Sequence, residues 1–357
     1  MYFYLFETLL YLSLAFTGGY IFLLFIPERS KPQIKVPIDV FQYALLGIPL
    51  FSFATILRTV FSLTDFAENL TFLELLLIVL KDYDFGNAWV WNLIICTAMF
   101  IVTMVSSARA NWFKWALALT WCLSIIAHGW ASHPASFSNI GLLSQSVHVA
   151  AISIWLGILI IVAWFTKGEW NWKAFVRWFT PVSIGSMILI TLAGISMMFI
   201  IVDNYINSWG INYGQALLLK HLVFLPMLLL AFMNGFMTKL TNDGRNEPRL
   251  QWWLRAETVI ALIILIITAF MGVQEPPHEG EFEDPSPSAL FLFLNGSVSD
   301  LSLQWHWNLP SVACILLGII SVGLLMMSYK QENRKLFILL TCIIIVFLFF
   351  GLLLAVQ

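Results

Sequence analysis

Apolar runs of about 20 residues recur along the whole 357-residue chain, and they constrain its fold more than any other feature. A bilayer core of roughly 30 Å is crossed by one helix of about that length. The composition, with 60% hydrophobic and only 11% charged residues, lies outside that of soluble globular domains. The sequence therefore predicts an all-α integral membrane protein.

Ten predicted spans follow from these runs. They cover about residues 3–26, 38–62, 88–107, 114–132, 142–165, 179–202, 215–238, 254–273, 310–328 and 336–356. The segment 71–80 is too short to cross a bilayer and has acidic residues around it, so it predicts an interfacial helix. Small residues such as Ser153 and Gly157 in the fifth span predict close approach between helix backbones. We expect a multi-helix transmembrane bundle of about ten spans, consisting of an eight-helix core and a C-terminal hairpin.

Basic residues are distributed unequally between the two sides of these spans. All of the 18 Lys and Arg residues except Arg58, Lys81 and Lys220 fall on the same side. Cytoplasmic loops retain Lys and Arg, so this asymmetry places both termini outside. It predicts a multi-pass protein of the plasma membrane in contact with lipid. The basic residues are dispersed among short loops, which predicts no nucleic-acid partner.

The longest polar interval, 273–309, is acidic and rich in Pro and Ser, and we interpret it as an extracellular loop. It separates a transmembrane core, residues 1–272, from the C-terminal hairpin, residues 310–357. The chain carries no hydrolase motif, nucleotide-binding loop or dinucleotide fingerprint. We therefore predict that the protein is not an enzyme and has no catalytic residues.

All six histidines fall on the predicted external side. His128 and His148 lie at the outer ends of the fourth and fifth spans, His221 lies in the seventh span, and His133 lies in an outer loop. An ionisable group inside a span is costly unless it faces the bundle interior, so such a group is a functional candidate. The fourth and fifth spans are consecutive, and this places the imidazoles of His128 and His148 near each other.

Imidazole binds copper, zinc, iron and nickel, whereas thioether sulfur favours reduced copper. Three methionines end the sixth and eighth spans on the external side. The predicted metal-ligating residues are His128, His148, His221, His133, Met197, Met198 and Met271. Other polar, aromatic or thiol groups within the spans are predicted to support the site or line a transport path. They are Glu7, Arg58, Trp155, Lys220, Asn234, Glu257 and Cys122.

Several segments in the same order resemble the copper resistance protein D family, whose members carry a CopD-type membrane domain. The segment "SQSVHVAAISIWLGILI" resembles a family helix with a His followed by Trp-Leu-Gly, and "RWFTPVSIGSMILITLAGI" resembles the next helix. "YGQALLLKHLVFLPMLLLAFMNG" and "RAETVIALIILIITAFMGVQEPP" are similar to the two that follow. The resemblance covers roughly positions 1–277 and implies copper handling at a bacterial cell membrane.

The leading hypothesis is therefore copper transport, in the direction of uptake, with external capture of copper ions by His and Met. Related proteins often carry an additional His-rich copper-binding domain, and its absence here predicts an extracellular copper-donor protein as partner. The first alternative is a b-type cytochrome, because facing histidines also ligate haem iron. In that case His128 or His148 would pair with His221 around haem b. A second alternative is a copper-handling or assembly partner protein.

Overall fold

The computed structural model describes residues 3–67, 69–105, 111–167, 172–240, 247–274, 276–277, 286–296 and 302–357. Within these ranges the chain is helical, and the only β-structure described there consists of isolated bridges. The all-α class that the composition predicts is confirmed.

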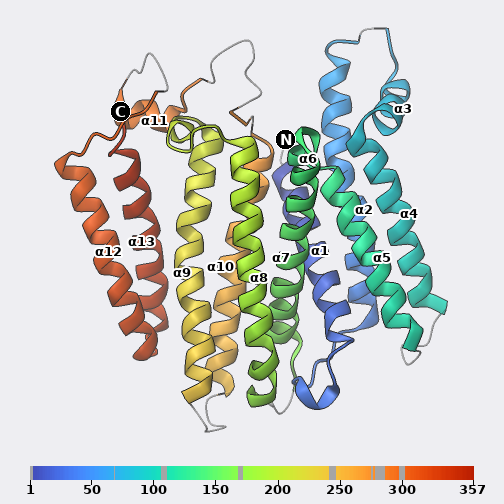
Figure 1. The fold of residues 1–357 in the computed structure, drawn as a ribbon, viewed down its shortest axis with the longest axis horizontal. Coiled ribbons are helices and arrows are strands. Elements are labelled where there is room, and N and C mark those ends of the chain that lie inside the picture. The colour runs from blue at the N-terminus through green and yellow to red at the C-terminus, as the bar shows by residue number, and fades with distance from the viewer. Residues whose placement is uncertain are drawn as a thin grey trace. The chain divides into compact units, whose positions relative to one another are not determined.

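In the described part of the chain, ten long helices correspond one to one with the predicted spans. They are α1 (Phe3–Leu23), α2 (Ile38–Thr64), α4 (Asp84–Val105), α5 (Asn111–Trp130), α7 (Asn139–Phe165), α8 (Trp172–Ile201), α9 (Asn212–Leu240), α10 (Glu247–Gly272), α12 (Leu309–Lys330) and α13 (Arg334–Leu353). Among the described residues, all of them except α5 are long and apolar enough to cross a membrane. Helix α5 is less apolar, yet it lies beside α4 and α7 in the bundle (Figure 1). The multi-span membrane bundle is confirmed.

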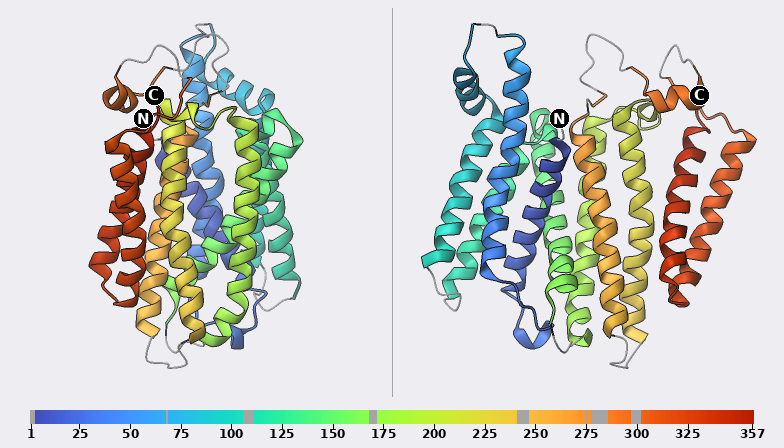
Figure 2. Two further views of the ribbon diagram at one scale, coloured as in Figure 1. Left: turned by 60° about the vertical axis from the view of Figure 1, so that its left-hand side comes forward. Right: turned by 180° about the vertical axis from the view of Figure 1, so that it is seen from behind.

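Shorter helices lie in the connections between the long ones. The predicted helix at 71–80 is confirmed as α3 (Phe72–Asp82), which lies beside α2 and α4 (Figure 1 and Figure 2). It begins with a capping box, in which the Thr71 hydroxyl accepts from the Glu74 N–H and the Glu74 carboxylate accepts from the Thr71 N–H. The Thr71 N–H and hydroxyl lower the pKa of Glu74 below its usual value. Helices α6 (His133–Phe137) and α11 (Ala289–Asn295), with 3-10 turns at Glu28–Ser30 and Asn207–Gly210, complete the described helices.

The chain forms two compact units. The first unit contains Met1–Ile200 and Met233–Val259, and the second contains Ile201–Phe232 and Ile260–Gln357. The predicted division at 273–309 stays a prediction, and much of that loop lies outside the described residues. We call the end of the first unit at which α1 begins its outer end, because this is the predicted external side.

Helices α1 and α7 of the first unit pack backbone against backbone. A Cβ atom placed on Gly19 would overlap the backbone of Gly157, and one placed on Gly157 would overlap the carbonyl oxygen of Ala15. One residue earlier in α1 and one turn earlier in α7, a Cβ on Gly18 would lie 2.9 Å from the Cβ of Ser153. The close approach that the small residues of the fifth span predict is thereby confirmed.

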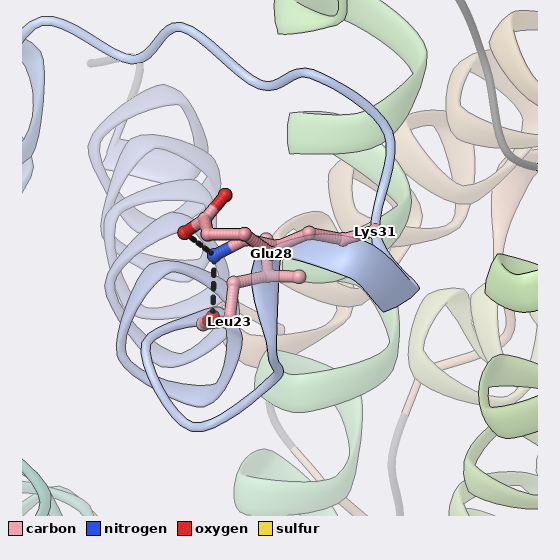
Figure 3. A network of polar contacts seen from close by, with 3 residues as sticks. All are labelled: Leu23, Glu28 and Lys31. Atoms are coloured by element: carbon pink, nitrogen blue, oxygen red, sulfur yellow. Dashed lines mark hydrogen bonds and ion pairs between the residues drawn. The ribbon is translucent and has the colours of Figure 1, made fainter.

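The C-terminal end of α1 is capped by a lysine from the following turn. The Lys31 ammonium donates to the Leu23 carbonyl oxygen at 3.2 Å and pairs with the Glu28 carboxylate at 2.7 Å (Figure 3). A positive charge stabilises the carbonyl groups that end a helix. The same loop is joined to the end of α7 by an antiparallel bridge between Ile34 and Thr166. These contacts fix the inner ends of α1 and α7 together.

Candidate functional site

His128 lies near the outer end of α5 and faces α1. Its imidazole stands edge-on to the ring of Tyr11, with ring centroids 6.1 Å apart and an interplanar angle of 89°. Its Nε2 atom is buried and has no hydrogen-bond partner among the residues that the structure describes. Buried polar atoms are nearly always satisfied, so an orphaned one points to a water molecule or an ion. This nitrogen is therefore a candidate ligand for an ion.

Tyr11 links this imidazole to a carboxylate on the same helix. The Tyr11 hydroxyl hydrogen-bonds to the carboxylate of Glu7, one turn earlier on α1. The guanidinium of Arg58, from α2, acts on the same carboxylate as a nearby positive charge. We call Glu7, Tyr11, Arg58 and His128 the outer cluster. Three of the four were singled out from the sequence, and Tyr11 was not in that list, although its spacing of four residues from Glu7 could have indicated it.

His148 is held in a defined orientation by α8. Its Nδ1 atom lies 3.0 Å from the carbonyl oxygen of Ile190. A carbonyl only accepts, so Nδ1 carries the proton and the lone pair of the ring lies on Nε2. Donation of one ring N–H to a backbone carbonyl is the usual arrangement of a metal-ligating histidine. The ring is buried, and its Cε1 atom lies 3.6 Å from the Cβ position of Gly194.

The described contacts give these two imidazoles different neighbours. His128 contacts α1, whereas His148 contacts α8. Each has a tryptophan seven residues away towards the inner end of its helix, Trp121 in α5 and Trp155 in α7. Both indoles are buried, and neither Nε1 has a hydrogen-bond partner among the described residues. Trp155 was singled out from the sequence, and Trp121 was not.

The other predicted ligands of the first unit lie at its periphery. His133 is half-buried at the first position of α6, with its ring edge-on to Phe137 at 5.0 Å. Met197 and Met198 are half-buried near the end of α8. Cys122, which was predicted to line a path, has an exposed side chain on α5.

Two of the predicted supporting residues meet in the inner half of the first unit. The Asn234 amide donates to the Glu257 carboxyl Oε2 at 2.9 Å, joining α9 to α10. Only 4% of Asn234 and 3% of Glu257 is exposed. The sequence identified both residues separately, and the structure makes them one buried pair.

The remaining predicted residues belong to the second unit. His221 is exposed, and its Nδ1 lies 2.8 Å from the hydroxyl of Tyr205. Burial raises the pKa of Tyr205 to about 12, with a smaller opposing effect from a hydrogen bond to Trp209. Lys220 and Met271 are half-buried.

Histidine, cysteine and carboxylate side chains do not gather in one place. Over the described ranges, no group of three or more of them is positioned to hold a metal ion. The arrangement instead offers single imidazoles, with methionines and one buried acid elsewhere.

Comparisons with known proteins place these residues in a family context. A model described as "Copper resistance protein D-like, N-terminal domain" matches residues 2–144, and one described as "Copper resistance protein D" matches residues 173–271. The copper transport protein CutJ of Bacillus subtilis (strain 168) is 25% identical over 240 residues, which is 61% of this chain. The chain spans only 42% of that relative's length. No solved structure matches.

Proposed function

Because the chain belongs to the copper resistance protein D family, we propose that it moves copper ions across the membrane, in the direction of uptake. The family and the helical membrane bundle both support a copper-handling membrane protein. The matched relative is described as a copper transport protein, which supports transport in particular. In this proposal copper is the cargo, and no bond-making chemistry is involved.

The buried Nε2 atom of His128, which has no hydrogen-bond partner among the described residues, is the observation that carries the proposal. A copper ion would supply the partner that this nitrogen lacks. The carboxylate of Glu7, which hydrogen-bonds to Tyr11, would favour an incoming cation, and Arg58 would balance the carboxylate when the cation is absent. Tyr11 stands between the acid and the imidazole and keeps both in place. The outer cluster is thus the proposed capture site.

His148 is proposed as a second copper-binding residue, because a backbone carbonyl anchors its Nδ1–H in the way that is usual for metal-ligating histidines. The methionines at the end of α8, Met197 and Met198, are softer ligands suited to reduced copper. His133 is a further proposed ligand at the outer end. In the second unit, His221 and Met271 are proposed as further copper ligands. An external copper-donor protein is the proposed partner.

Metal content and the visible spectrum of the purified protein test this proposal together. We expect bound copper, no stoichiometric iron and no Soret band. We expect His128→Ala to lose copper relative to wild type. His306→Ala is the matched control, since His306 is exposed and only its backbone makes a described hydrogen bond. Stoichiometric iron with a Soret band would instead make the protein a b-type cytochrome, and equal copper in the two variants would remove His128 from the site.

A further inference from the structure

Glu257 is the only acidic residue among the buried residues that the structure describes. It lies on α10, seven residues after Leu250, where the apolar stretch of that helix begins. At a rise of 1.5 Å per residue, this places the carboxyl about 10 Å inside the apolar layer. The proposed capture of copper does not use this residue, and acids within a membrane span are rarely retained without a function.

Among the described residues, the Glu257 carboxyl has one hydrogen-bond partner and no cation acting on it. The Asn234 amide donates to Oε2 at 2.9 Å, and no charged side chain among the described residues acts on the carboxyl. The nearest basic residue along α10, Arg255, is directed towards α7. Its Nε donates to the Ala163 carbonyl oxygen at 3.0 Å, and its guanidinium lies 5.0 Å from the ring centre of Trp164.

Two further side chains of α10 form hydrogen bonds with α7. Gln251 donates to the same Ala163 carbonyl, and Thr258 accepts from the Trp164 indole N–H. In these contacts, α7 presents a backbone carbonyl and an indole, and α9 presents an amide. Besides Glu257 itself, Arg255 on α10 is the one titratable group that these contacts involve. Nothing described around the Glu257 carboxyl pairs with its negative charge.

Electrostatics decides which form of this carboxyl the protein accommodates. Taking an isolated carboxylate out of water costs far more than one neutral hydrogen bond returns, and a buried acid without a cation neutralises instead. A proton satisfies this requirement without any rearrangement of neighbouring side chains. Water reaching the site would stabilise the carboxylate and release the proton.

We propose that Glu257 is a proton-binding site, held by Asn234, which takes up and releases one proton in each transport cycle. This inference rests on the proposed function, because it supplies the coupling ion for copper movement. The step is proton transfer alone, in which a proton from water adds to a carboxylate oxygen and later returns to water. No electron moves. Copper transport then depends on pH through one identifiable carboxyl.

Infrared difference spectroscopy tests proton binding without reference to copper. The purified full-length protein should show a protonated-carboxyl C=O band at neutral pH, and E257Q should lose it. E28Q is the matched control, because the Glu28 side chain is 88% exposed and should leave the band unchanged. A band that persists in E257Q would overturn the assignment. E257D keeps a carboxyl at this position and should retain a band. It therefore shows whether loss of the band in E257Q reflects loss of the carboxyl or misfolding of the protein.

Copper uptake into proteoliposomes, followed as a function of pH, tests the coupling. A single protonation changes the occupied fraction by up to about tenfold per pH unit, so the wild-type rate should vary to that extent. We expect E257Q to flatten the profile and to abolish copper-dependent change of internal pH, and E257D to restore both. Wild-type uptake with an unaltered profile in E257Q would overturn the coupling while leaving the proposed function intact. Absence of copper uptake in the wild type would refute the proposed function itself.

Discussion

Gly157→Ala should separate α1 from α7 and destabilise the first unit. The new Cβ would overlap the Ala15 carbonyl oxygen and lie 2.7 Å from the Gly19 nitrogen and 2.8 Å from the Ala15 carbonyl carbon. Real Cβ atoms essentially never approach other atoms closer than 3.0 Å, and here the obstacles are backbone atoms. The backbone cannot rotate away as a side chain can, so α1 must move as a body.

The free-energy cost follows from two opposing effects. Overpacking of a tight interface costs about 1–3 kcal/mol. Exchange of Gly for Ala in a helix interior returns about 1 kcal/mol. We therefore expect a net destabilisation of up to about 2 kcal/mol for Gly157→Ala. Gly185→Ala in α8 is the control, because a Cβ at Gly185 meets nothing within 4 Å, and it should be neutral or slightly stabilising.

Thermal unfolding in detergent, followed by intrinsic tryptophan fluorescence, measures the difference between these variants. The indole of Trp121 is a local reporter, since its Cζ2 atom lies 2.9 Å from the Cβ position of Gly18 at this interface. We expect a lower midpoint for Gly157→Ala than for Gly185→Ala. Identical midpoints would show that α1 and α7 do not pack backbone to backbone, and the reasoning from small residues would fail.

Three further predictions concern single contacts. Lys31→Met should cost about 0.3–1 kcal/mol in thermal unfolding by removing the cap of α1, whereas Glu28→Gln should be silent because Glu28 is exposed. The lowered pKa of Glu74 means that its stabilisation of α3 is complete above the usual glutamate pKa and is lost as pH falls through the lowered value. Amide hydrogen exchange in α3 should become faster as the pH falls through this range. In Glu74→Gln, this pH dependence of the exchange rate should be absent. Ser124→Ala should lower the free energy of unfolding by about 0.6–1.7 kcal/mol, because it removes the 2.6 Å hydrogen bond from the Ser124 hydroxyl to Asn92. An unchanged midpoint of thermal unfolding would contradict this prediction.

The long helices were predictable because the bilayer imposes their length and apolarity on the sequence. Helix α3 was predictable for the complementary reason, since its apolar run is too short to cross. Helices α6 and α11 were not predicted. Five and seven residues respectively are too few to show a helical period, and both interrupt segments rich in turn-forming residues.

The pairing of site residues was much less predictable than the spans. Helices in lipid are apolar on every side, so no hydrophobic stripe indicates which helix packs against which. The contact between His128 and Tyr11 therefore depends on a packing order that the sequence does not state. The partner of His148 is a backbone carbonyl, that of Ile190, which leaves no trace in residue type. Asn234 and Glu257 were each recognisable as polar residues within spans, but not as a pair.

Copper accumulation in sealed proteoliposomes is the most direct test of the central claim. Liposomes with wild-type protein should accumulate radioactive copper above the level of empty liposomes. His128→Ala should accumulate much less, and His306→Ala should match the wild type. Wild-type liposomes that accumulate no more copper than empty ones, from a preparation shown to be folded, would contradict the claim that this protein transports copper.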